Sequence, residues 1–167
     1  MASVKVLHAL LRNSRRTTIE HTLCFARHSY GNEVEFANAF GPQCKEQFDI
    51  LIVTYDLLAL RNTPYWPALK KIILKQSFLC SKVAFFPQDD YSSCAALDGL
   101  FVSTPNSVVY SPIVNDLQVL YPRSLKLGIR FNEALTGYVD EKLDLIASKY
   151  SRPFGSRTID VGQRIRY

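Results

Sequence analysis

Short apolar runs alternate with amphipathic segments along most of the chain. The clearest run covers residues 48–55 and is nearly continuous and rich in β-branched side chains. Such a run predicts a strand that is buried within a parallel sheet. Shorter apolar runs predict further strands at 5–11, 34–36, 83–86 and 107–110, and a last strand within 127–135.

Helical spacing fills the intervals between these strands. In residues 65–76 the apolar positions Leu69, Ile72 and Ile73 recur with the period of a helix. Helices are also predicted at 19–28, 94–97, 114–120 and 142–149. Strands that alternate with helices predict an α/β fold, here a Rossmann-like, doubly wound, mostly parallel sheet with helices on both faces.

The length of 167 residues fits a single domain. We expect residues 1–150 to form one Rossmann-like N-terminal domain. Residues 151–167 contain Pro153, Gly155 and Gly162, and we expect them to form an irregular tail.

Charge and composition narrow the class of partner. The formal net charge is +5, and the Lys and Arg residues are scattered rather than gathered in a stripe. Nucleic-acid binding is therefore not expected, whereas weak attraction to anionic substrates or to an anionic membrane surface is. No apolar run approaches the roughly 20 residues of a membrane span.

The cysteines are far apart in the sequence and form no CxxC motif. This spacing gives neither a zinc pattern nor a redox pair. We interpret them as reduced, partly buried thiols of a cytoplasmic protein; they are Cys24, Cys44, Cys80 and Cys94.

A polar group follows the strand predicted at 83–86. After Pro87 come Gln88, Asp89, Asp90 and Tyr91. In open α/β sheets ligands bind outside the carboxyl ends of the strands, so these side chains are candidates to hydrogen-bond ligand hydroxyls. Two other interpretations are a helix N-cap at Asp90 and a divalent metal site. No third hard ligand follows nearby, so no metal is expected.

Three further places carry candidate chemistry. Thr136, Gly137 and Tyr138 form either a simple turn or a loop whose backbone approaches a ligand closely. Arg164 either forms an ion pair with an acidic neighbour at the surface or binds a phosphate through two hydrogen bonds of its planar guanidinium group. His21 lies in the first predicted helix, where it is either structural or a general base at the ligand-binding edge.

Several well-known motifs are missing from the sequence. There is no GxGxxG after the first strand, no P-loop and no GxSxG. Asp56 ends a central strand, as a phosphorylated aspartate does in receiver domains. That chemistry also needs an acidic pair after the first strand, where this chain has Arg12, Asn13 and Ser14.

Taken together, seven short motifs occur in an order that resembles a known family. The family comprises bacterial glycosyltransferases with two Rossmann-like domains, the GT-B architecture, and the resemblance covers nearly the whole chain as their N-terminal half. The motifs are Ile19-Glu20-His21, Phe48-Asp49-Ile50 with Thr54-Tyr55, Pro64-Tyr65-Trp66, Pro87-Gln88-Asp89-Asp90-Tyr91, Tyr121-Pro122, Leu135-Thr136-Gly137-Tyr138-Val139, and Arg157-Thr158-Ile159-Asp160-Val161-Gly162-Gln163-Arg164.

Two positions depart from the family pattern. Asp90 stands where the family usually has Glu, which keeps the charge and shortens its reach. Gln163 stands where the family usually has Tyr, which removes an aromatic surface.

The resemblance implies an acceptor-side domain that is inactive by itself. The chain would hold a glycan or lipid-linked acceptor, and a missing C-terminal domain or a partner chain would hold the nucleotide-sugar donor. His21 would be the general base, and Arg164 would face the donor phosphates. Residues that would orient the acceptor are Gln88, Asp89, Asp90, Tyr91, Thr136, Gly137 and Tyr138.

The same resemblance implies no cofactor and no metal, because this architecture stabilises the leaving diphosphate with helix termini and basic side chains. It implies a cytoplasmic protein, with peripheral association at the inner membrane surface as a further expectation. The alternative is a non-catalytic binding or assembly module that kept the fold. The departures at Asp90 and Gln163, and a chain that ends about where a donor domain would begin, motivate that alternative.

Overall fold

A computed structural model describes residues 1–9, 31–43, 45–88, 91–134, 145 and 149. The chain divides into two units, Met1–Thr136 and Gly137–Tyr167, and the first contains nearly every described residue. The helix predicted at 19–28, most of the helix predicted at 142–149, and the tail 151–167 lie outside the described residues.

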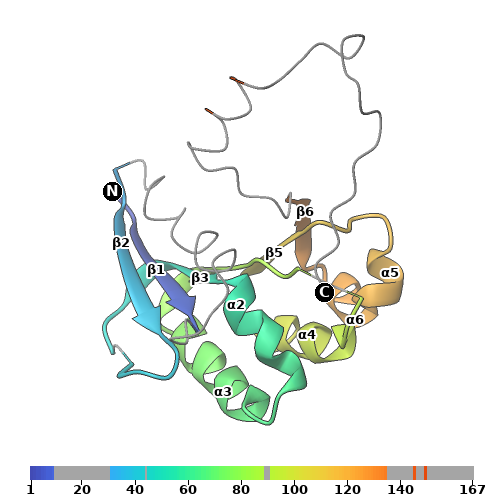
Figure 1. Ribbon diagram of the computed structural model, residues 1–167, viewed down its shortest axis with the longest axis horizontal. Helices are drawn as coiled ribbons and strands as arrows, with labels where there is room; N and C mark the ends of the chain where they lie inside the picture. Colours follow the sequence, from blue (N-terminus) through green and yellow to red (C-terminus); the bar gives the residue numbers. More distant parts are fainter. Residues whose placement is uncertain (10–30, 44, 89–90, 135–144, 146–148, 150–167) are drawn as a thin grey trace. The chain divides into compact units, whose positions relative to one another are not determined.

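The first unit is built on a six-stranded, all-parallel sheet with the order β2-β1-β3-β4-β5-β6 (Figure 1). The predicted Rossmann-like α/β fold is therefore confirmed. Each predicted strand is present, with ends that differ by a few residues from the pattern. The strands are β1 (Ser3–His8), β2 (Glu33–Asn38), β3 (Phe48–Val53), β4 (Cys80–Phe85), β5 (Ser107–Ser111) and β6 (Arg130–Glu133).

The direction of strand addition reverses at β1. From β1 the chain adds β2 on one side, where Val6 aligns with Phe36, and β3 on the other, where Val6 aligns with Ile52. Because the later strands continue outward from β3, the boundary between β1 and β3 is the topological switch point of the sheet. This is the position at which open α/β sheets bind their ligands.

The described helices include those predicted at 65–76, 94–97 and 114–120. The second of these is longer than predicted, and the third is shorter. Three short elements were not predicted, α2, η1 and α6. The helices are α2 (Tyr55–Leu58), the 3-10 helix η1 (Ala59–Asn62), α3 (Trp66–Ser77), α4 (Cys94–Phe101), α5 (Leu117–Leu120) and α6 (Pro122–Lys126).

The hydrophobic core lies between the sheet and these helices. Phe85 of β4 contacts Phe101 of α4, with ring centroids 4.9 Å apart, and both side chains are fully buried. Each such side chain contributes roughly 1.5–3 kcal/mol by leaving water. Val6 points to the opposite face from Leu7 and is also fully buried. Both faces of β1 are therefore covered, as expected for a strand inside a parallel sheet.

Asp98 joins α4 to α6. This buried carboxylate accepts hydrogen bonds from the backbone amides of Arg123 at 3.2 Å and Ser124 at 2.9 Å, and from the Ser124 hydroxyl. It therefore caps the amino end of α6 from a neighbouring helix and satisfies amides that have no partner within α6.

Two of the four cysteines can be compared with the prediction. Cys80 and Cys94 are free, half-buried thiols, as predicted, whereas Cys24 and Cys44 lie outside the described residues. Burial raises the pKa of the Cys80 thiol above its usual range. Among the described residues, no helix has the length and apolar character needed to cross a membrane.

Candidate functional site at the carboxyl edge of the sheet

The carboxyl ends of the central strands bring polar residues from distant parts of the sequence to one edge. His8 ends β1, Thr54 follows β3, and Gln88 follows β4. These strands are neighbours in the sheet and run in the same direction, so their ends lie at the same edge. The edge includes the switch point between β1 and β3.

Asp56 ties this edge together. Its Oδ2 accepts a hydrogen bond from the Ala9 amide at 2.6 Å, and its Oδ1 accepts one from the Thr54 hydroxyl. The carboxylate is nearly buried, with 9% of the residue exposed. Because both carboxylate oxygens accept hydrogen bonds within the protein, Asp56 fixes the end of β1 to the start of α2. This structural role explains a buried aspartate at the end of a central strand without phosphorylation of the kind that receiver domains use.

His8 is the described histidine at the switch point. Burial lowers the pKa of its imidazole, and the negative charge of Asp56 acts in the opposite direction. The ring lies beside Phe36, with centroids 6.3 Å apart. Burial therefore favours the uncharged form of the imidazole near neutral pH. Sequence reasoning did not select His8; its place at the end of the first strand was the available signal.

The segment after β4 has the predicted position. The Phe86 amide donates to the Val53 carbonyl at 3.1 Å, Pro87 is buried, and Gln88 is half-buried. Tyr91 is 71% exposed. The helix that follows begins at Cys94, with Ser93 as its N-cap residue. The interpretation of Asp90 as the N-cap of this helix is therefore wrong, because the turn extends three residues further.

Buried Arg61 fixes the loop between β4 and α4 at Ser92. Its Nε donates to the Ser92 carbonyl at 2.7 Å, and a terminal guanidinium nitrogen donates to the Leu58 carbonyl at 3.1 Å. The Asn62 side-chain amide donates to the Ser92 hydroxyl at 3.0 Å. Two residues of η1 therefore fix the loop between β4 and α4. Sequence reasoning did not select Arg61, because it is an isolated arginine in a turn that the sequence pattern does not predict.

The structure describes two of the predicted site residues, Gln88 and Tyr91, and both follow β4 at the carboxyl edge. The other predicted site residues lie outside the described residues: His21, Asp89, Asp90, Thr136, Gly137, Tyr138 and Arg164.

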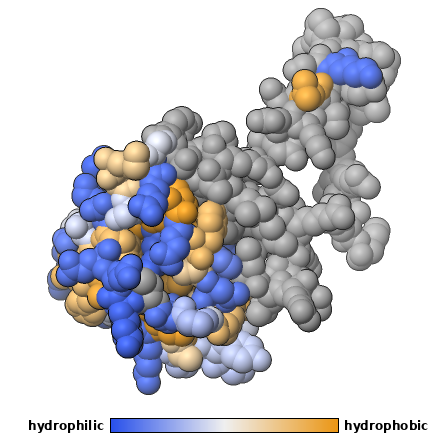
Figure 2. Space-filling model, turned by 90° about the vertical axis from the view of Figure 1, so that its left-hand side faces the viewer, coloured by the Kyte–Doolittle hydropathy of each residue, from blue (hydrophilic) through white to orange (hydrophobic). Residues whose placement is uncertain are grey.

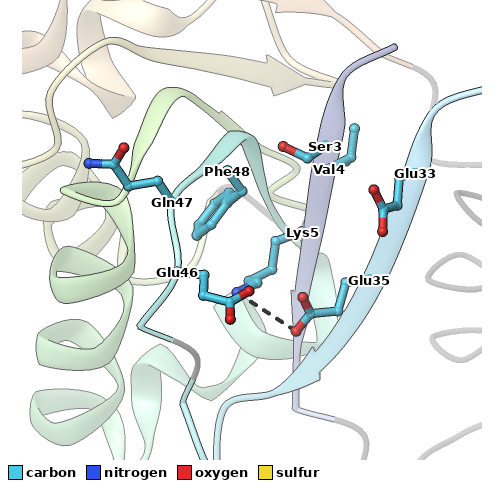
Figure 3. A pocket seen from close by; sticks show the side chains of 8 residues that line it. All are labelled: Ser3, Val4, Lys5, Glu33, Glu35, Glu46, Gln47 and Phe48. Atoms are coloured by element: carbon cyan, nitrogen blue, oxygen red, sulfur yellow. Dashed lines mark ion pairs between the residues drawn. The ribbon is translucent and has the colours of Figure 1, made fainter.

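A different hollow lies at the opposite, amino edge (Figure 3). It has a volume of about 180 Å³ and is lined from β1, β2 and the start of β3. Lys5 is buried in it, 3.7 Å from a carboxylate oxygen of Glu35 and 4.4 Å from the centre of the Phe48 ring. Glu33 and Glu46 also line it. Within the described part of the chain, no set of His, Cys, Asp or Glu side chains gathers as metal ligands would.

An adjoining hollow of about 310 Å³ continues along the amino edge toward β4 and includes Phe78 and Cys80. Open parallel sheets bind ligands at the carboxyl edge, not at the amino edge. In addition, Glu35 already neutralises the charge of Lys5. We therefore assign the candidate site to the carboxyl edge. We interpret the two amino-edge hollows as surface depressions between the first residues of neighbouring strands, without a binding role. No known protein-family model matches the chain, and a search of curated proteins gave no match.

Proposed function

We propose that this chain is the acceptor-side domain of a glycosyltransferase. It binds a glycan or lipid-linked acceptor at the carboxyl edge of its sheet. The nucleotide-sugar donor binds to another domain or to a partner chain, so the chain alone does not transfer sugar. The ordered motif set and the all-parallel sheet support this proposal.

The observation that carries the proposal is the placement of Gln88. It follows β4 at the edge that contains the switch point, in a segment that Arg61 and Asn62 fix at Ser92. An amide both donates and accepts hydrogen bonds without charge, which suits neutral sugar hydroxyls. The exposed Tyr91 phenol adds a second group of the same kind.

The remaining assignments follow the family pattern. In this proposal Asp89, Asp90 and the loop 136–138 complete the acceptor site. Arg164 faces the donor phosphates, and His21 takes the proton from the acceptor hydroxyl. The free thiols of Cys80 and Cys94 fit a cytoplasmic protein, and we place its action at the inner membrane surface, where lipid-linked acceptors are found.

The test is a calorimetric titration of the chain with mono- to pentasaccharides. We expect saturable binding that Gln88→Ala weakens about tenfold, the effect of one lost hydrogen-bonding group. The matched control is Gln47→Ala, which removes an exposed glutamine at the amino edge. An absence of saturable binding, or equal losses in both variants, contradicts the proposal. Binding by a chain that transfers no sugar when joined to a donor-binding domain identifies the non-catalytic module instead.

A further inference from the structure

An exposed pair of aromatic rings lies at the same edge of the sheet, beside edge strand β2. Phe40 and Tyr65 meet edge to face, with ring centroids 6.1 Å apart and an interplanar angle of 83°. Phe40 is 46% exposed and Tyr65 is 61% exposed. Phe40 comes two residues after β2 ends. Tyr65 is the N-cap residue of α3, which returns the chain to the amino end of β4. Both rings therefore belong to the carboxyl edge.

The backbone around both rings is held in place. The Phe40 amide donates to the Asn38 side chain at 2.9 Å. The Gln43 side-chain nitrogen lies 2.8–3.1 Å from three carbonyl oxygens of residues 38–41. The Tyr65 carbonyl accepts hydrogen bonds from two backbone amides in the first turn of α3, at 3.0 and 3.1 Å. Two exposed rings on fixed backbones form a preorganised surface, which lowers the entropy cost of binding.

One short segment connects this pair to the proposed acceptor site. Arg61 and Asn62 bond Ser92 in the loop after β4, and Tyr65 follows only three residues later. In the sheet, β2 and β4 are separated by three strand spacings, about 14 Å. A ligand that reaches both Gln88 and the aromatic pair is therefore longer than one sugar ring.

The pair is too small for a protein partner. Two rings that are about half exposed offer on the order of 200 Å², far below the roughly 800 Å² per partner of a stable interface. On the side of the molecule where β2 lies, hydrophobic areas are interspersed with hydrophilic side chains (Figure 2). The apolar C–H face of a pyranose can stack on one of the two rings while the perpendicular ring contacts its edge, and its hydroxyls match polar surroundings.

We infer that the acceptor is an oligosaccharide, bound with one sugar at Gln88 and another sugar of the same oligosaccharide packed against Phe40 and Tyr65, stacked on the face of one ring and in contact with the other. This inference rests on the proposed function and specifies its substrate class. It predicts that affinity rises with oligosaccharide length and that the gain depends on the two rings.

The test compares mono- to pentasaccharides of glucose, galactose and N-acetylglucosamine, titrated into the wild-type chain and into the Phe40→Ala/Tyr65→Ala double variant. We expect the double variant to lose about tenfold in affinity for the longest bound oligosaccharide, and to bind the monosaccharide as the wild type does. A Phe40→Leu/Tyr65→Leu variant keeps apolar surface and removes the rings. Phe78→Ala, at the amino edge and 72% exposed, is the matched control.

The outcomes separate this inference from the proposed function. If no saccharide binds the wild type, both fail. If saccharides bind with an affinity that is independent of length, or if the double variant binds as the wild type does, the stacking inference is overturned and the proposed function stands. If the Leu variant binds as tightly as the wild type, the rings are not needed and the inference also falls. Circular dichroism confirms that each variant is folded.

Discussion

Asp56 accepts a 2.6 Å hydrogen bond from the backbone amide of Ala9, across the boundary between β1 and β3 at which strand order reverses. The two residues are 47 positions apart in the sequence. The bond therefore fixes the geometry of the switch point, where the candidate site lies.

Asp56→Ala is expected to lower the free energy of unfolding by about 3 kcal/mol, because the Ala9 amide and the Thr54 hydroxyl lose a charged acceptor in a buried place. Asp56→Asn keeps one carbonyl oxygen and should recover part of this loss. Denaturant unfolding measures both. Asp116→Ala is the control, since Asp116 is exposed and makes no side-chain cap bond. Equal stability of Asp56→Ala and Asp116→Ala would refute the assigned role.

Arg61→Lys is expected to loosen the loop after β4, because a lysine cannot bond the Ser92 and Leu58 carbonyls with one planar group. The amide chemical shifts of Tyr91 and Ser92 should change, while those within α3 stay unchanged. Arg130→Lys, at an exposed arginine, is the control. Unchanged amide chemical shifts in the loop would show that Arg61 does not position it.

Lys5→Met is expected to leave stability within about 1 kcal/mol of the wild type or to raise it. The ammonium is buried beside an exposed Glu35 at 3.7 Å, and an apolar side chain of similar length avoids the cost of desolvating the ammonium. The control is Lys82→Met on β4, where the lysine is exposed. A loss of more than about 2 kcal/mol in the free energy of unfolding would mean that the amino-edge hollow depends on the Lys5 charge. The hollow would then again be a candidate site.

His8 is expected to make the fold less stable in mild acid. Burial lowers its folded pKa below the value of about 6.5 that it has in the unfolded chain. Between these two values the unfolded chain binds more protons, so stability falls as pH drops below about 6.5 toward the folded pKa. His8→Gln should remove this part of the pH dependence. Unfolding curves between pH 7.5 and 5 measure it, and identical slopes in both proteins would contradict the assignment.

The fold was accessible from the sequence because its strands are apolar enough to be recognised one by one. The run ending at Val53 must lie inside a parallel sheet, and helical spacing around Leu69 and Ile73 places a helix next to it. The elements that were missed, α2, η1 and α6, are one turn or little more. Tertiary contacts such as Asp98 with Ser124 stabilise them, and these contacts leave no periodic pattern.

The site was accessible only in part, for the same reason. A polar group directly after a buried strand is visible in the sequence, and it predicts Gln88 and Tyr91 at the carboxyl edge, where the structure has them; their part in binding stays a prediction. Asp56 was noticed as a strand end, but its bond to Ala9 depends on the register of strands distant in the sequence. Arg61 gave no local signal, because its partner Ser92 is 31 residues away.

The most direct test of the central claim is a nuclear magnetic resonance titration of the isotope-labelled chain with the longest bound oligosaccharide. The account predicts saturable shift changes at Ala9, Thr54, Gln88 and Ser92, with the amino-edge residues Lys5 and Phe78 unaffected. Saturable changes confined to the amino edge, or no saturable change at any residue, would contradict it.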